Sequence, residues 1–343
     1  MKLSVIVPVY NMAGGKLNYC LDSLLSQELP REEYEIIAVD DASTDDSLCI
    51  LKEYEKRENG HIRVIASPEN HRQGSAKNKG LSIATGEWVG FVDSDDWVHP
   101  SMYRDLLKKA EETGADFVGC DYSLVAKETM EPGDYQKSTS LEQCGELTKE
   151  KHGLHILNPG SMCMKIYKRD VIEKNHLRFP EDVFYEDNYA SSYWSLFYSK
   201  YAKVEKAYYY YRMDPASTTH RISWQRCLDR MVTAKKLLTD VQAAGLYDVY
   251  KAETDYRVMQ LFYVITLFSY MQEGKHRKAK HTKQLQKEVV KMLPDFAKNA
   301  YYEKQVSAEE KKLLNLHQKN NLLFFCYYGL QVAYRKARKK KEK

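Results

Sequence analysis

The sequence lacks several features that mark large classes of proteins. No apolar run reaches the roughly 18 to 20 residues that span a bilayer, so we expect no transmembrane helix. The amino-terminal apolar stretch is only as long as a strand, so we expect a core strand there and no secretory signal. The first turn contains PVYNMAGG instead of G-x-G-x-x-G, which argues against a dinucleotide-dependent oxidoreductase.

The cysteines indicate neither a metal site nor a disulfide framework. There are seven, an odd number, and they are scattered along the chain without a C-x-x-C pair. Metal and redox sites built on cysteine need such short spacings. We therefore interpret the cysteines as reduced packing residues of a cytoplasmic protein.

Charge is divided unequally along the chain, although the net charge is only +4. Residues 221–343 hold 26 Lys and Arg against 12 Asp and Glu, a difference of +14. Residues 1–220 hold the remaining 26 against 36, a difference of −10. A basic carboxyl-terminal part indicates an anionic partner, either a membrane or a nucleic acid.

Apolar and amphipathic segments alternate through the first 122 residues. Four segments have the composition of buried strands, and helical patterns separate them: LSVIVPVY, YEIIAVDDAS, HIRVIASPEN and EWVGFVDSDD. This alternation predicts a doubly wound, mostly parallel α/β sheet, to which residues 123–220 add further strands. From residue 222 the apolar positions follow helical spacing. We therefore predict an α/β domain at 1–220 and a helical region at 221–343.

Three carboxylates, Asp93, Asp95 and Asp96, follow the fourth predicted strand. Like charges this close repel, and the carboxyl ends of strands are where open α/β sheets bind ligands. Strand alternation would put Asp93 and Asp95 on one side and turn Ser94 away. A divalent cation such as Mg²⁺ or Mn²⁺ would compensate the repulsion. The structural alternative is a helix N-cap made by Asp95 or Asp96.

Two further predicted strands end at the same rim of the sheet. The first has Pro8, Tyr10 and Asn11 at its end, and the second has Asp40 at its end. Ligands of open α/β sheets lie across several strand ends. A nucleoside would fit there with its base near Asp40 and its ribose hydroxyls near Asp93.

Four ordered segments together resemble family 2 glycosyltransferases, inverting enzymes of the GT-A fold: SVIVPVYN, IIAVDDASTDDS, GSAKNKGLSIATGEWVGFVDSDDW and YEDNYASSYW. The resemblance covers about residues 1–220, with a nucleotide-sugar half at about 1–122 and an acceptor half at about 123–220. It implies transfer of a hexose or hexose derivative from a nucleotide-diphosphate sugar, with UDP as the expected nucleotide. KIYKRDVI, LRF and YYYR resemble the branch that builds bacterial capsule, exopolysaccharide and teichoic-type surface glycans. That branch implies a glycan or polyprenyl-linked acceptor.

The resemblance implies a role for each donor-side residue. Asp40 would contact the nucleotide base, and Asp93 would contact ribose or metal. Asp95 would bind a Mn²⁺ or Mg²⁺ ion that bridges the diphosphate, with Ser94 beside it on the donor side.

A departure from the family pattern lies between the third strand and its helix. Where relatives have A-R-N, this chain has Ala76-Lys77-Asn78. Lysine keeps the positive charge but lacks the planar fork of arginine. We expect Lys77 to contact phosphate or base, and Arg72 to supply the missing guanidinium.

On the acceptor side, FYEDNY matches the family's E-D element. The resemblance implies that Asp187 takes the proton from the acceptor hydroxyl and that Glu186 positions it. A capping pair at a helix start is a compatible alternative. Arg212 follows four tyrosines and is interpreted as a diphosphate contact. Trp97 is interpreted as a residue that stacks on a sugar or fills the core.

The chain ends with an apolar aromatic stretch, LLFFCYYGLQVAY, followed by seven Lys or Arg among the last nine residues. This is the two-signal pattern of peripheral attachment to anionic lipid. A solvated charged end and a nucleic-acid contact are the alternatives. We predict a metal-dependent glycosyltransferase on the inner face of the cell membrane, with no nucleic-acid partner and with a homodimer left open. The alternative is an inactive sugar-nucleotide-binding module, against which Asp93, Asp95 and Asp187 argue.

Overall fold

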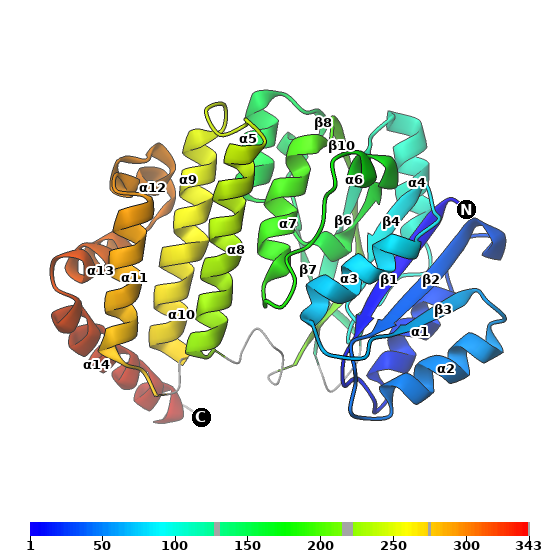
Figure 1. Cartoon of the computed structure of the whole chain (residues 1–343), viewed down its shortest axis with the longest axis horizontal. Helices are drawn as coiled ribbons and strands as arrows, with labels where there is room; N and C mark the ends of the chain where they lie inside the picture. The colour runs from blue at the N-terminus through cyan, green and yellow to red at the C-terminus, as the bar shows by residue number, and fades with distance from the viewer. Residues whose placement is uncertain (127–130, 215–221, 274–275, 342–343) are drawn as a thin grey trace. The chain divides into compact units, whose positions relative to one another are not determined.

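The computed structural model describes residues 1–126, 131–214, 222–273 and 276–341 (Figure 1). The chain divides into two compact units, Met1–Asp214 and Pro215–Lys343. The domain boundary predicted at residue 220 lies outside the described residues.

Within the described residues, a ten-stranded sheet forms the core of the first unit. Its order is β3-β2-β1-β4-β9-β6-β10-β5, with β7 paired to β6 and β8 paired to β10. The strands are β1 (Leu3–Val9), β2 (Tyr34–Asp40), β3 (Ile62–Ala66), β4 (Trp88–Phe91), β5 (Trp97–Val98), β6 (Phe117–Ala126), β7 (Pro132–Gln136), β8 (Gly145–Glu146), β9 (Lys165–Lys168) and β10 (Lys200–Met213).

The parallel part of the sheet follows directly from the apolar runs. β1 is buried along its whole length and pairs in parallel with β2 and β4, while β2 pairs in parallel with β3. A strand buried on both faces is mainly apolar, which is the pattern that the sequence shows. The buried polar residue of β1, Ser4, donates a hydrogen bond to Glu35 of β2 at 2.7 Å. The predicted α/β sheet is confirmed. Its additions enter in mixed directions, because β9 lies antiparallel between β4 and β6.

Helices connect and cover these strands. They are α1 (Lys16–Leu25), α2 (Ser47–Arg57), α3 (Arg72–Ile83), α4 (Met102–Thr113), α5 (Lys149–Leu157), α6 (Arg169–Lys174) and α7 (Glu186–Trp194), with short 3-10 turns at Arg31–Glu33, Leu141–Gln143, Met162–Met164 and Ser195–Phe197. α4 ends where Gly114 adopts a left-handed conformation, a common helix stop. Figure 1 shows α3 and α7 next to each other, and this pair positions the site.

The second unit is helical, as predicted. Its helices are α8 (Trp224–Ala243), α9 (Lys251–Met259), α10 (Thr266–Glu273), α11 (Ala279–Met292), α12 (Ala300–Gln305), α13 (Ala308–Lys319) and α14 (Asn321–Lys341), with a π-helical turn at Gln260–Ile265 and a 3-10 turn at Phe296–Lys298. A capping box of Ser307 and Glu310 forms at the start of α13. Among the described residues, no helix is both long enough and apolar enough to span a membrane.

Candidate functional site

The three carboxylates lie in a turn. β4 ends at Phe91, and the backbone N–H of Asp96 donates to the carbonyl oxygen of Asp93 at 3.0 Å. The strand expected to continue through Asp93 and Asp95 ends before them, so these two residues lie in a turn and not on a β-strand. Ser94 is buried within this turn.

Asp96 supports the end of β10. It is buried, and its Oδ2 accepts a hydrogen bond from the Tyr209 hydroxyl at 2.7 Å. Its Oδ1 accepts one from the backbone N–H of Arg212 at 2.8 Å. The alternative of a helix N-cap made by Asp95 or Asp96 is contradicted, because Ser101 occupies the N-cap of α4. Both carboxylate oxygens of Asp96 thus have protein partners.

Asp93 and Asp95 carry negative charge that the protein compensates only in part. Among the described residues, the buried Oδ1 of Asp93 has no hydrogen-bond partner, and the Lys77 Nζ lies 4.0 Å away. Burial raises the pKa of Asp95 to about 6, and repulsion from Asp93 contributes. The positive charges of Lys16 and Arg212 oppose this shift. The turn is therefore suited to a ligand that brings positive charge.

Lys77 joins the two sides of the site. It lies on α3, and its Nζ donates to the Oε1 of Glu186 at 2.8 Å. Both side chains are buried, and Glu186 begins α7. Because the same ammonium also faces Asp93, one cation lies between the carboxylates of Asp93 and Glu186. The expected contact of Lys77 with phosphate or base stays a prediction.

Asp187 is the accessible carboxylate of the pair. Its Oδ1 accepts a hydrogen bond from the backbone N–H of Asn188 at 2.9 Å, and part of its surface is open to solvent. Crowding by protein atoms removes much of the water around the carboxylate and raises the pKa of Asp187 to about 6, with repulsion from Glu186 next in importance. A carboxylate with raised proton affinity that remains accessible can act as a general base.

The segment before α7 is held against α3. The Asn78 side chain donates to the carbonyl oxygen of Phe179 and accepts from its backbone N–H, each at 2.9 Å. A Cβ atom on Gly74 would lie 2.0 Å from the carbonyl oxygen of Pro180. Tyr185, just before α7, has a φ of 66°, a conformation that costs energy in a residue other than glycine. Asn78 and Gly74 are positioning residues that the sequence alone did not reveal.

The end of β2 offers a second orphaned carboxylate oxygen. Asp40 is buried, and its Oδ2 accepts from the backbone N–H of Ser43 at 3.1 Å. Its Oδ1 has no hydrogen-bond partner among the described residues. A buried acceptor without a partner is costly unless a ligand supplies a donor. Arg72 lies further along, at the start of α3, with its guanidinium 4.4 Å from the centre of the Phe184 ring.

The loop after β1 is tied to the loop after β2. Asn11 adopts a φ of 54°, and its Oδ1 accepts from the backbone N–H of Thr44 at 2.8 Å. Its own backbone N–H donates to the Ser43 hydroxyl. Pro8 is buried, whereas Tyr10 is exposed. Asn11 thus shapes the rim, and Tyr10 is open to a ligand.

Two basic residues and an aromatic group flank the acidic turn. The buried Nε of Arg212 has no hydrogen-bond partner within the described part of the chain. Lys16, which sequence reasoning missed, donates to Asp214 at 2.8 Å. Trp97 is half-buried, and its ring centre lies 6.2 Å from Tyr19 and 5.9 Å from Tyr210. No sequence pattern pointed to Lys16, because its partner lies 198 residues away.

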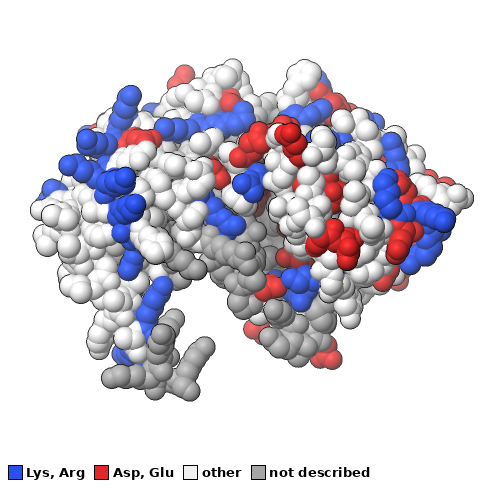
Figure 2. Space-filling view, turned by 60° about the horizontal axis from the view of Figure 1, so that its bottom comes forward, with Lys and Arg blue, Asp and Glu red and all other residues white. Residues whose placement is uncertain are grey.

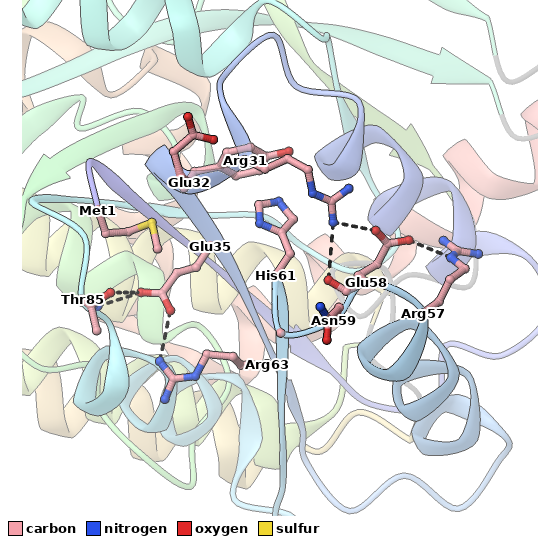
Figure 3. Close-up of a pocket in the computed structure, with 12 residues that line it drawn as sticks. Met1, Arg31, Glu32, Glu35, Arg57, Glu58, Asn59, His61, Arg63 and Thr85 are labelled. Carbon is pink, nitrogen blue, oxygen red and sulfur yellow. Dashed lines mark hydrogen bonds and ion pairs between the residues drawn. The ribbon is translucent and has the colours of Figure 1, made fainter.

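A separate polar pocket of about 770 Å³ lies where β2 and β3 begin, away from these strand ends (Figure 3). Its charged side chains pair with one another, as Arg63 with Glu35 at 3.1 Å and Arg31 with Glu58 at 2.8 Å. None of the predicted site residues lines it. The pocket is therefore distinct from the candidate site.

The described residues contain no group of three or more His, Cys, Asp or Glu side chains that could hold a metal ion. Mg²⁺ and Mn²⁺ often bind with one or two carboxylates and complete their coordination with substrate phosphates and water. The orphaned Oδ1 of Asp93 and the charge density at Asp95 fit such a cation. The residues present thus fit a metal ion whose remaining ligands would be oxygen atoms of a bound diphosphate and of water.

The family model described as "Glycosyl transferase family 2" matches residues 4–175. YibD of Escherichia coli (strain K12), named an uncharacterized glycosyltransferase, is 34% identical over 195 residues, which are 54% of this chain and 54% of YibD. This chain thus spans about half the length of that relative. EpsH of Bacillus subtilis (strain 168), which carries a provisional glycosyltransferase name, is 31% identical over 271 residues, 77% of this chain and 74% of EpsH.

A solved structure shares the fold. The crystal structure of Staphylococcus aureus TarS 1–349 in complex with UDP-GlcNAc has a TM-score of 0.68 with this chain at 24% identity. The alignment covers 98% of this chain and 92% of the TarS chain. This similarity shows that the arrangement of helices and strands is common to both.

Proposed function

Because this chain belongs to glycosyl transferase family 2, we propose that it transfers a sugar from a nucleotide-diphosphate donor to an acceptor hydroxyl group. The observation that carries the proposal is the ion pair between Lys77 and Glu186, with Asp93 at 4.0 Å from the same ammonium. This ion pair supports the proposal because it links Glu186, the neighbour of the candidate base Asp187, to Asp93 beyond the carboxyl end of β4. Open α/β sheets bind their ligands at this edge.

On the donor side, the proposed ligand is a UDP-hexose or a derivative of one. The orphaned Oδ1 of Asp40 would accept a hydrogen bond from the base, and Asp93 would contact ribose. Pro8, Tyr10 and Ser94 would line the nucleotide. The UDP-GlcNAc complex of TarS, which has the same fold, makes UDP the first nucleotide to test.

Asp95 would hold Mn²⁺ or Mg²⁺, with Asp93 beside it. A bound divalent cation stabilises negative charge on a departing diphosphate. Lys16 and Arg212 act in the same sense, because their positive charges oppose the rise in the pKa of Asp95. The Nε of Arg212 also has no hydrogen-bond partner among the described residues. Positively charged side chains that are already in position stabilise the negative charge that develops on the leaving group. They do not have to move during the reaction.

On the acceptor side, Asp187 would remove the proton of the attacking hydroxyl. The hydroxyl oxygen forms a bond to C1 of the sugar as the bond from C1 to the diphosphate breaks, and the proton passes to Asp187. Attack opposite the leaving group inverts the configuration at C1, as in inverting glycosidases that use water. Glu186, held by Lys77, keeps the start of α7 in place.

The proposed acceptor is a surface glycan or its polyprenyl-linked precursor. Trp97 would stack on a sugar ring together with Tyr19 and Tyr210, because apolar ring faces of sugars and aromatic side chains fit one another. A lipid-linked acceptor would require the enzyme to work at the inner face of the membrane, and the basic carboxyl terminus would bring it there.

A panel of nucleotide sugars tests the proposal. Purified protein is given UDP-glucose, UDP-GlcNAc, UDP-galactose and GDP-mannose with Mn²⁺, and release of the nucleotide is measured. We expect metal-dependent release from a UDP-sugar. Asp95→Ala should weaken Mn²⁺-dependent donor binding by at least about tenfold, or about 1.4 kcal/mol, whereas the exposed control Asp134→Ala should not.

Two results would change the proposal. If Asp95→Ala keeps the full Mn²⁺ dependence of the wild type, the metal lies elsewhere. If the wild type binds UDP with Mn²⁺ but neither hydrolyses nor transfers any sugar, the protein is a sugar-nucleotide-binding module and not an enzyme.

A further inference from the structure

The carboxyl-terminal helix α14 has two unlike faces. Phe324, Tyr328 and Val332 recur every four residues and are buried. The Phe324 ring lies 4.8 Å from His317 of α13, and the Tyr328 ring lies 5.5 Å from Phe268 of α10. This face anchors the helix to the rest of the second unit.

The opposite face is apolar and exposed. Five large apolar side chains on this face have exposed fractions from 48% to 72%. We call this set the α14 stripe, and it consists of Leu322, Leu323, Tyr327, Leu330 and Tyr334. No charged residue occurs from Asn321 to Tyr334. A helix with an exposed apolar face can bind an apolar surface through that face.

Basic residues follow this stripe along the chain. Seven of the nine residues from Arg335 to the end of the chain are Lys or Arg. Figure 2 shows basic side chains gathered over the second unit beside an area without charged side chains. An apolar helical face next to a basic cluster matches a surface that is apolar inside and anionic at its boundary.

We propose that α14 docks on an anionic lipid surface, with the α14 stripe in the apolar boundary and the basic terminus among the headgroups. The helix would lie in the plane of the membrane, held by apolar burial and by charge together. Tyr327 and Tyr334 suit this depth, because tyrosine has an apolar ring and a polar tip. This inference refines the proposed membrane location and is independent of the proposed chemistry.

A second copy of the chain fits the stripe less well. From Leu322 to Tyr334 the helix rises about 20 Å, and a helix is about 10 Å wide, so the stripe offers roughly 200 Å². A stable interface needs about 800 Å² from each partner. Parallel pairing of two such helices would also place two clusters of seven basic residues side by side.

Substitution in the stripe tests this docking. Leu330→Ser removes an exposed apolar side chain without changing charge, and Val232→Ser, at a 50% exposed position on α8, is the matched control. The full chain is mixed with phosphatidylcholine vesicles that contain phosphatidylglycerol, and bound protein is measured by cosedimentation. We expect Leu330→Ser to weaken vesicle binding roughly tenfold, and Val232→Ser to leave it unchanged.

The same samples give the contrary outcomes. The inference fails if the wild type does not bind these vesicles, or if Leu330→Ser binds them as the wild type does. It also fails if the wild type is a dimer in solution that Leu330→Ser separates while vesicle binding is unchanged, because the stripe would then join two copies. Binding of UDP with Mn²⁺, measured in parallel, reports separately on the proposed activity.

Discussion

Glu186 and Asp187 are neighbours in the sequence, but their surroundings differ. Glu186 is buried, and its carboxylate accepts from the ammonium of Lys77 at 2.8 Å. Asp187 has part of its surface open, and its pKa is raised to about 6. Two adjacent carboxyl groups in different environments can take different roles. These surroundings favour positioning by Glu186 and proton transfer by Asp187.

At the residue scale, the proposed base predicts a pH profile. Asp187 must be ionised to accept a proton, and its raised pKa moves the loss of activity from the usual acidic range to near neutrality. With saturating donor and Mn²⁺, kcat should fall about tenfold for each pH unit below about 6 and level off above it. Asp187→Asn should lower kcat at least about 100-fold while UDP binding persists.

Saturating metal matters for this measurement, because the pKa of Asp95 is also about 6. Protonation of Asp95 would lower the apparent affinity for Mn²⁺, whereas protonation of Asp187 would lower kcat. An Asp187→Asn variant with nearly wild-type kcat would remove Asp187 as the base.

At the scale of elements, the site depends on how α3 meets the segment before α7. α3 was predicted from its sequence as a helix, but its partner segment was not. His71, at the N-cap of α3, accepts from the backbone N–H of Asp182 through its carbonyl oxygen, and its ring contacts the Asp182 carboxylate at 2.8 Å. Lys77 and Asn78 make the other links, to Glu186 and Phe179. Helix periodicity reveals a buried face but not which loop will cover it.

Gly74→Ala tests this contact between elements. The new Cβ would lie 2.0 Å from the backbone oxygen of Pro180, so the helix or the segment must shift. We expect a loss of about 1 to 3 kcal/mol in the free energy of unfolding together with a lower kcat. Gly329→Ala on α14, where the nearest atom is the Met271 Cε at 3.9 Å, should instead stabilise by up to about 1 kcal/mol.

Urea denaturation of both variants and a transfer assay measure these changes. A Gly74→Ala protein with unchanged stability and unchanged kcat would show that the segment before α7 does not need its close approach to α3.

At the scale of the whole molecule, two units of opposite charge share one chain. Their separate sequences already carry differences of −10 and +14 on either side of residue 220. The candidate site residues all lie in the first unit, whereas the α14 stripe and the basic terminus lie in the second. We therefore expect substitutions in the first unit to change sugar transfer, and substitutions in the α14 stripe or the basic terminus to change membrane binding.

Deleting residues 335–343 tests this separation. The deletion removes seven basic residues, and each Lys or Arg near an anionic membrane contributes about 1 kcal/mol. Affinity for phosphatidylglycerol-containing vesicles should fall at least about tenfold and lose most of its salt dependence, while UDP binding stays unchanged. Vesicle affinity equal to that of the full chain would exclude the tail as an attachment signal.

The sequence by itself determined the α/β alternation, the acids at the strand ends and the family to which the chain belongs. These features follow from local patterns, because buried strands, helix periodicity and short motifs can each be recognised from residues that are close together in the sequence. For this reason Asp93, Asp95 and Glu186-Asp187 are recognisable as site candidates from their neighbouring residues alone.

Only the tertiary structure decided how those residues are used. In the folded protein β4 ends at Phe91, and the Asp96 carboxylate accepts a hydrogen bond from Tyr209, 113 residues away. Asp93 and Asp95 are partly exposed. The fold also joins Lys77 to Glu186 across 109 residues of sequence. Such pairs depend on the path of the chain between them, and β9 enters the sheet against the direction of its neighbours. The pattern of residues within one segment does not predict these contacts. Burial and charge compensation depend on segments that meet only in the folded protein.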